Sequence, residues 1–459
     1  FPALHHWNQS LLLEVRQAVD TSLLEAAVGQ LLRHHDALRL RFSHTPAGWQ
    51  QVNTGVDEAV PFASIDVSMV PPEAQSVAVA AAAAALQASL DLTWGPLLRV
   101  AYLHLGDQQA GRLLIVIHHL AVDGVSWRIL LEDLHVAYQQ LSRHEPVQLP
   151  PKTTSVQHWS QRLVAYAQSA TLRQELAYWL EASTARVDRL PIDYAGGMND
   201  EASAETVAVL LRPDETQTLL QAVPAAYRTQ INDVLLTALV KAFSRWTGKR
   251  ALLVDLEGHG REEVLEGIDL SRTVGWFTTI FPVLLDLGKT LGPGEALQVI
   301  KEQLRRIPNR GIGYGLLRYL CEDTEFTAPL RALPQAEVSF NYFGQLDQAV
   351  PQSTPFVPAR ESRGLERSAL GTRSYVLDVI GSVRGGRLQL RWVYSNNLHR
   401  RKTIENLAQG FLEELRLLIS HCTAPEAGGY TPSDFALAKL NQEKLGRVLA
   451  TIARSKQGY

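Results

Sequence analysis

The stretch LLIVIHHLAVDGVSW (113–127) places five apolar residues directly before His118 and His119, and follows them with Asp123 and Gly124. An apolar run of this length, rich in β-branched side chains, predicts a buried β-strand. Successive side chains of a strand point to opposite faces, so one imidazole is expected to reach a cleft while its neighbour supports the fold. The stretch therefore predicts a strand that presents a functional histidine at its end.

The residues after the histidines predict a tight turn into a helix. Asp123 and Gly124 can turn the chain sharply and return a carboxylate toward the loop, so Asp123 is interpreted as an organiser and not as a base. The segment SWRILLEDLHVAYQQLSR (126–143) has apolar residues three or four apart and predicts the helix behind the turn. Its first residue, Ser126, is suited to cap that helix.

Outward from this stretch, apolar strands alternate with amphipathic helices. Strands are expected at 10–15, 37–42, 97–105, 112–119 and 251–260, and helices at 21–35, 78–90, 126–143, 171–183, 231–248, 407–419 and within 431–453. Connectors are expected at 145–155 and 193–205, where proline, glycine or small polar residues gather. The second connector sets the predicted domains, 1–190 and 191–459. Each half has a helix before a strand that ends in polar residues, which predicts an α/β fold with two related lobes.

Composition limits the possible functions. The 459 residues are 46% hydrophobic and 20% charged, as in an ordinary globular protein, and the formal net charge of -3 offers no basic footprint for nucleic acid. The apolar runs fall short of the ~20 residues that a membrane span needs. With only Cys321 and Cys422, no disulfide framework is indicated, and a cytoplasmic location is expected. The chain is expected to be part of a longer protein, because it begins without methionine.

Alternative sites can be weighed from the residues alone. A metal site at His118 and His119 is disfavoured, because adjacent strand residues diverge and HHxxxD is unlike the helical HExxH spacing. The pair His34 and His35 lies at a predicted helix end without a following glycine turn, and is interpreted as structural. The glycines of GIGYG (311–315) do not match a dinucleotide fingerprint. No metal or nucleotide site is therefore expected.

A second chemical candidate follows the apolar run ALLVDL. Glu257 opens the glycine-bounded loop EGHGRE (257–262). From the residues alone, a loop carboxylate paired with Arg261 is the favoured interpretation. The alternative is a partly desolvated carboxyl whose pKa rises until it can both take and give a proton near neutrality. His259 is a rival base in this loop, but between two glycines it is interpreted as shaping the loop.

These motifs resemble a known family. HHLAVDGVSWRIL carries the HHxxxDG signature of the condensation-domain superfamily of nonribosomal peptide synthetases, which is similar to chloramphenicol acetyltransferase. Further segments resemble the epimerization domains of that superfamily more than its condensation domains: EGHGRE, RTVGWFTTIFPVLL (272–285), NRGIGYGLLRYL (309–320) and FNYFGQLD (340–347). The resemblance runs from HHWNQSLLLEV near the start to TPSDF close to the end, although the family's early proline-glutamine-tryptophan motif is missing. It implies two acetyltransferase-like lobes in a V-shaped pseudo-dimer, with the site in a tunnel between them.

The resemblance also implies roles for single residues. It assigns catalysis to His119, a structural role to His118, and the opposing carboxylate to Glu257, reversing the preference stated above. It favours Tyr342 as a substrate contact, while Asn341, on the other face of the same strand, is expected to support the fold. Gly124 and Asp123 are expected to shape the loop. Channel contacts are expected from Ser126, which can equally cap its helix, and from Trp276 and Phe277.

The activity implied by the resemblance is reversible L-to-D epimerization. The substrate would be an aminoacyl or peptidyl thioester on the 4'-phosphopantetheine arm of an upstream peptidyl carrier domain, within a multidomain synthetase. Inversion requires removal of the α-proton on one face and return of a proton on the other, so two acid/base groups are needed. No cofactor bound by the domain itself is expected, and neither a nucleic acid nor a membrane is an expected partner. The alternative is a peptide-bond-forming condensation domain.

Overall fold

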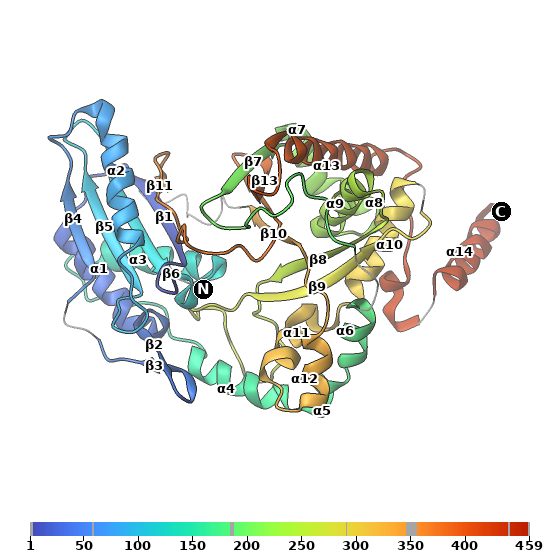
Figure 1. Ribbon diagram of the computed structural model, residues 1–459, viewed down its shortest axis with the longest axis horizontal. Helices are drawn as coiled ribbons and strands as arrows, with labels where there is room; N and C mark the ends of the chain where they lie inside the picture. Colours follow the sequence, from blue (N-terminus) through green and yellow to red (C-terminus); the bar gives the residue numbers. More distant parts are fainter. Residues whose placement is uncertain are drawn as a thin grey trace.

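The computed structural model describes residues 3–56, 59–183, 188–290, 292–345, 356–438 and 441–457. Two mixed sheets lie in separate halves of the molecule, on the left and the right of Figure 1, with a chain segment passing between them. A two-stranded hairpin, β2 (Leu40–Thr45) with β3 (Gly48–Asn53), stands apart from both sheets. Within the described residues, no helix has the length and apolar character needed to cross a membrane.

The first sheet has the order β11-β1-β6-β5-β4. Its strands are β1 (Asn8–Val15), β4 (Phe62–Asp66), β5 (Leu98–His104), β6 (Gly111–His118) and β11 (Phe356–Pro358). The central strand β6 is antiparallel to β1 and to β5. One face packs on α1 (Thr21–His34) and α3 (Gly124–Ser142), and the other on α2 (Pro72–Gln87). Burial on both faces explains the unbroken apolar run before the histidines.

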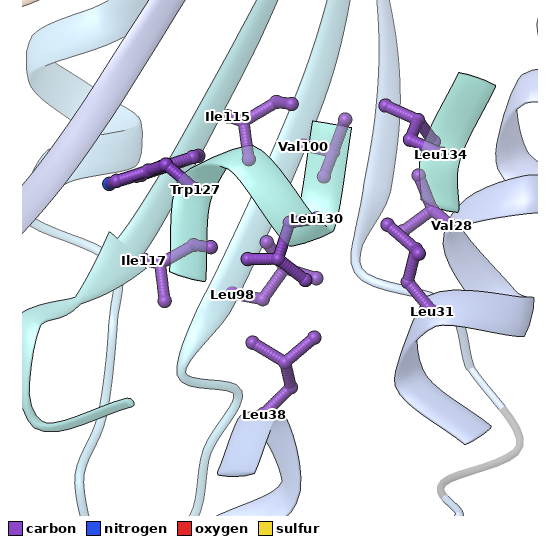
Figure 2. Close-up of a pocket in the computed structure, with 10 residues that line it drawn as sticks. All are labelled: Val28, Leu31, Leu38, Leu98, Val100, Ile115, Ile117, Trp127, Leu130 and Leu134. Atoms are coloured by element: carbon purple, nitrogen blue, oxygen red, sulfur yellow. The ribbon is translucent and has the colours of Figure 1, made fainter. Parts of the chain in front are cut away.

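The core between this sheet and the helices α1 and α3 contains a small void, shown in Figure 2. Its volume is about 20 Å³, and ten apolar side chains line it, among them Ile115, Ile117 and Leu130. A space of this size holds about one water molecule, but water needs polar partners that these side chains do not supply. The void is therefore a gap in the packing and not a ligand site.

The second sheet has the order β7-β13-β12-β10-β8-β9. Its strands are β7 (Ala204–Leu210), β8 (Ala251–Gly258), β9 (Thr279–Asp286), β10 (Val338–Gln345), β12 (Leu377–Arg384) and β13 (Arg387–Ser395). The helices α9 (Ile231–Thr247) and α13 (Arg401–Cys422) supply much of the core against one face. Val254, Leu256, Phe340 and Val379 point into that core. Residues that alternate with them, such as Glu257 and Asp378, point to the other face.

The remaining helices range from four to 16 residues in length. They are α4 (Val156–Ala167), α5 (Ala170–Arg173), α6 (Leu176–Ser183), α7 (Pro213–Gln221), α8 (Val223–Tyr227), α10 (Pro293–Arg305), α11 (Ile312–Gly315), α12 (Thr324–Arg331) and α14 (Gln442–Gln457). The segment expected as one helix over 171–183 is divided between α5 and α6. The strand expected at 37–42 begins as a 3₁₀ turn, Asp36–Arg39, and becomes β2 only at Leu40.

The two cores do not separate at the division between 1–190 and 191–459. Trp159, Leu172 and Trp179 from α4 to α6 belong to the core of the second sheet. The chain therefore passes from the first core to the second directly after the connector at 145–155. In the opposite direction, β11 returns from the second half and pairs with β1 (Figure 1). Composition marks where the chain is exposed, but it does not reveal which core a helix joins.

Candidate active site

A cavity of about 550 Å³ is lined by both halves of the molecule. From the first half it takes His118 and His119 at the end of β6, together with Trp7 and neighbouring residues of the N-terminal segment. From the second half it takes Glu257 of β8, Trp276, and parts of the segment 367–378. Two acid/base candidates that are far apart in sequence therefore share one cavity.

The two adjacent histidines differ in environment, as expected. His118 is only 1% exposed, and its ring lies between the Leu4 carbonyl oxygen, 2.9 Å from Nε2, and the Leu120 N–H, which donates to Nδ1 over 3.2 Å. Burial lowers the pKa of His118 to about 4. The ring is thus held neutral by the fold and is unsuited to gain a proton.

His119 begins the 3₁₀ turn His119–Ala121 that follows β6. Its Nδ1 lies 3.0 Å from the Val122 carbonyl oxygen, and its Nε2 lies 3.0 Å from the Gln9 side-chain nitrogen. The indole rings of Trp7 and Trp276 pack against the imidazole, with ring centroids 5.1 and 4.8 Å away. Burial among these groups lowers the pKa of His119, because it disfavours the charged form.

Asp123 organises the loop and joins the two halves. Its carboxylate accepts from the Ser126 N–H and so caps α3, and it also accepts from the Phe277 N–H. The Arg261 guanidinium forms an ion pair with the same carboxylate at 3.2 Å, with both side chains buried. Arg261 is therefore the partner of Asp123, and pairing of Arg261 with Glu257 was the wrong alternative. Gly124 follows Asp123 as the first residue of α3, where an added Cβ would meet the exposed ring of Phe343.

Glu257 lies near the end of β8, on the face opposite the helices α9 and α13. Its side chain is exposed, but the surface it exposes faces the cavity. The surrounding protein raises the pKa of Glu257 to about 7 by desolvation, the negative charge of Asp378 adds to the increase, and Arg367 opposes it. Near neutral pH the carboxyl group therefore exists in both protonation states, as acid/base work requires.

The residues Asn341 and Tyr342 exchange their expected positions. The Asn341 amide donates to the Glu257 carboxylate, so Asn341 is the residue of this pair that adjoins the cavity wall. Tyr342 packs against the core of the second sheet and is not among the residues that line the cavity. Side chains alternate along β10 as predicted. Val338 and Phe340 point into the core, so Tyr342, two residues further on, lies on the core side and Asn341 lies on the other face. The last two residues of FNYFGQLD, 346 and 347, lie outside the described residues.

Two residues expected to line the channel, Ser126 and Phe277, are instead buried away from the cavity. Ser126 is fully buried, where its hydroxyl donates to the Gly275 carbonyl oxygen and accepts from the Arg261 guanidinium, and Asp123 rather than Ser126 caps the helix. Phe277 is buried beneath the Arg261 guanidinium, which lies 4.1 Å from its ring centroid. Trp276, the neighbour of Phe277, does line the cavity. Sequence alone could not tell which of these two aromatic side chains the core would take.

The other histidine candidates lie away from this cavity. His259 accepts from the Arg261 N–H and pairs with Glu262 at 3.2 Å, which agrees with a role in shaping the loop. Donor atoms of His34, His35 and Asp133 lie within 4.8 Å of one another. Asp133, however, already accepts from His35 and is paired with the Arg272 guanidinium. A cation beside that guanidinium would be repelled, so the cluster is not a suitable metal site.

Sequence reasoning missed several charged groups of the cavity. Arg367, Glu201 and Asp378 all line it, and Arg367 pairs with Glu201 at 3.0 Å. Asp378 accepts from Ser339 and is held by Arg373. Asp378 could have been found as the single carboxylate in the apolar strand SYVLDVIG. Arg367 carries no such local signal, because only the path of the segment after β11 brings it to the cavity.

Comparisons with known proteins agree with this fold. The family model for the condensation domain matches residues 1–441. A linear gramicidin synthase protein of Brevibacillus parabrevis is 51% identical over 451 residues, which are 98% of this chain but 6% of that much longer protein. The crystal structure of the epimerization domain from the third module of tyrocidine synthetase B is 35% identical, with a TM-score of 0.86 over 92% of this chain and 94% of that one.

The fold is that of the condensation domains, two α/β halves around a shared cavity. The first condensation domain of the calcium-dependent antibiotic synthetase has the same fold at 18% identity, with a TM-score of 0.68 over 92% of this chain and 93% of that one. The chain belongs to the condensation-domain family of nonribosomal peptide synthetases, and it is similar within that family to an epimerization domain. It spans only a small fraction of the length of the synthetases that it matches.

Proposed function

We propose that this chain epimerizes the α-carbon of an aminoacyl or peptidyl thioester carried on the phosphopantetheine arm of a peptidyl carrier domain. The observation that carries the proposal is that His119 and Glu257, from different halves of the molecule, line one cavity. The similarity to the tyrocidine synthetase epimerization domain supports the choice of reaction. The proposed domains are an N-terminal lobe with the HHxxxDG motif and a C-terminal lobe with EGHGRE, and the partner is a carrier domain of the same synthetase.

In the proposed reaction, one group removes the α-proton and the electron pair of the C–H bond moves onto the thioester oxygen as an enolate. The other group then returns a proton to the opposite face of the α-carbon. In each turnover one group starts as the base and the other as the protonated acid, either neutral His119 with the Glu257 carboxylic acid or the Glu257 carboxylate with the His119 imidazolium. Exchange of these protons with solvent restores the starting state. The chain's own residues carry out these steps, with no resident cofactor proposed.

The enolate requires stabilisation of its developing negative charge. Arg367 is suited to this, because its guanidinium lines the cavity with both acid/base groups within reach of its charge. Trp7 and Trp276 exclude water around His119, which strengthens electrostatic interactions at the reacting atoms. Arg367 is thus the proposed electrostatic partner of the intermediate.

The proposal is tested with a carrier domain that holds an L-aminoacyl thioester, incubated with this chain in deuterated buffer. We expect α-deuterium and D isomer in the released amino acid. Glu257→Gln keeps the shape of the side chain but removes its acid/base function, and should slow exchange by about 10²-fold or more. Glu263→Gln, at an exposed carboxylate six residues along the chain, is the matched control and should retain the activity.

A second loaded carrier in the same assay separates epimerization from condensation. A longer peptide, formed without α-deuterium, would overturn the proposal in favour of a condensation domain. Unchanged formation of the D isomer in Glu257→Gln would remove this carboxyl group from the mechanism.

A further inference from the structure

A chain of hydrogen bonds connects helix α3 to the imidazole of His119. The Trp127 indole N–H donates to Gln9 Oε1 over 2.8 Å. The nitrogen of the same amide lies 3.0 Å from His119 Nε2, and His119 Nδ1 lies 3.0 Å from the Val122 carbonyl oxygen. Gln9 stands on β1, where it is paired with Ile117 of the histidine strand β6. Three elements of the first half therefore converge on one catalytic candidate.

The groups at the two ends of this series of hydrogen bonds, the Trp127 indole and the Val122 carbonyl, determine which atoms between them donate and which accept. An indole N–H can only donate, so the Gln9 oxygen must face Trp127 and the Gln9 NH₂ group must face His119. A carbonyl oxygen can only accept, so His119 carries its proton on Nδ1 and donates it to Val122. His119 Nε2 is then an acceptor for the Gln9 amide. The ring is specified as the neutral tautomer with its lone pair on Nε2.

This arrangement disfavours protonation of His119. An imidazolium is a donor at both nitrogens, and its Nε2–H would oppose the N–H of Gln9. The amide could accept that proton only by turning its oxygen toward His119, which would leave the Trp127 indole N–H facing a second donor. Trp127 is 8% exposed and packed in the core of the first sheet, so it cannot turn away easily. An unpaired buried donor is costly.

Other ionisable groups also act on the ring. The positive charge of Arg367 lowers the pKa of His119, whereas the negative charge of Asp123 raises it. His118 is its sequence neighbour, and His6 and Glu257 line the same cavity. None of these groups dictates which nitrogen holds the proton, because they act through space on the ring as a whole.

We propose that Gln9 is a positioning residue that, anchored by Trp127, holds His119 as the neutral Nδ1–H tautomer and yields its bond to Nε2 when the substrate enters. Nε2 has one lone pair, so the Gln9 amide and the α-proton of the substrate cannot use it together. This inference rests on the proposed function only in its last step. The tautomer and its dependence on Trp127 are properties of the protein without substrate.

The experiment follows the His119 ring by NMR in the full chain labelled with ¹⁵N and ¹³C histidine, with the His119 signal identified by its loss in His119→Gln. The wild-type ring should be the Nδ1–H tautomer and should resist protonation. Gln9→Glu keeps the shape and can accept from both neighbours, so it should raise the pKa of His119 by about 1–3 units. Gln389→Glu, on β13 of the second sheet, is the matched control and should leave this titration unchanged.

Trp127→Phe is the second variant and adds no charge. Loss of the indole N–H frees the Gln9 amide to turn and accept from imidazolium, so the pKa of His119 should rise here too. Trp179→Phe, which removes an indole N–H from the other core, controls for loss of stability and should not shift the titration. An unchanged His119 titration in both Gln9→Glu and Trp127→Phe would overturn the inference.

Activity separates this inference from the proposed function. In deuterium exchange, the acid limb of the kcat/KM profile should move upward in Gln9→Glu by the same amount as the pKa of His119. If the pKa of His119 rises in Gln9→Glu but the acid limb of the kcat/KM profile does not move, the link between Gln9 and the reaction would be overturned. Absence of exchange in the wild-type chain would instead contradict the proposed function, while the tautomer result would stand by itself.

Discussion

On the wall of the cavity that the first sheet supplies, both nitrogens of His119 have hydrogen-bond partners, whereas on the opposing sheet the Glu257 carboxyl group accepts from the side-chain amide of Asn341. The pKa of His119 is lowered and that of Glu257 is raised to about 7, in both cases chiefly because the surrounding protein desolvates the group. The same desolvation acts in opposite directions because it always favours the neutral form. Desolvation in one cavity therefore keeps both a neutral imidazole and a half-ionised carboxyl group available near neutral pH.

The largest expected effect comes from removing the histidine itself. His119→Ala should lower α-deuterium exchange by about 10⁴-fold, the upper end of the contribution of a general acid–base group, since ring and tautomer are both lost. The measurement is the initial exchange rate on a loaded carrier domain. His259→Ala is the control, because that histidine lies in the EGHGRE loop away from the cavity lining. Retained exchange in His119→Ala would show that His119 is not an acid/base group of the reaction.

The raised pKa of Glu257 can be tested through its charged neighbour. Asp378→Asn removes a like charge, so the pKa of Glu257 should fall below 7, and the limb of the exchange profile that follows Glu257 should move to lower pH by less than about one unit. The measurement is kcat/KM as a function of pH. Asp255→Asn, on the same face but hydrogen-bonded to Tyr375, is the control. A limb that moves equally in both variants would indicate general damage to the sheet.

Protein stability gives a test of Glu257 that does not depend on activity. The folded-state pKa lies above the ordinary value of 4.5, so between pH 4.5 and 7 the folded chain keeps a proton that the unfolded chain loses. Stability contributed by this group therefore falls as the pH rises through that window. Glu257→Gln should melt like the wild type at pH 5 and about 2 °C higher at pH 8. Glu263→Gln should show no such pH-dependent difference in thermal unfolding.

The smallest effect is expected at the strand that supports Glu257. Tyr342→Phe should change the exchange rate by less than about two-fold, because its ring packs against the core and general acid–base groups contribute far more. Asn341→Ser shortens the partner of Glu257 and should have the larger effect of the two. The comparison is of initial exchange rates under identical loading. A greater loss of exchange rate in Tyr342→Phe than in Asn341→Ser would indicate that the Tyr342 hydroxyl contacts the substrate.

The main strands and helices were predictable because their signals are local. The apolar run ending at His118 became β6, and the periodic segment 231–248 became α9, ended by Gly248 in the left-handed conformation (φ 71°). The segment 171–183 was harder, since periodicity does not reveal a break between α5 and α6. Within the site, the divergent environments of His118 and His119 followed from strand alternation and adjacent burial. The pairing of Arg261 with Asp123 did not, because the residues alone favoured the nearby Glu257, whereas Asp123 lies 138 residues away in the chain.

The sequence by itself determined which chemical groups this protein offers: two histidines after a buried strand, a carboxylate at a second strand end, and motifs that mark the condensation-domain family. Only the tertiary structure decided which of these groups share a cavity, since Glu257 and Arg367 reach His119 through the packing of two sheets and a returning segment. It also set the phase of each strand, turning Asn341 toward Glu257 and Tyr342 toward the core. The physical reason is that alternation and periodicity are local, whereas the face that becomes buried depends on partners distant in the chain.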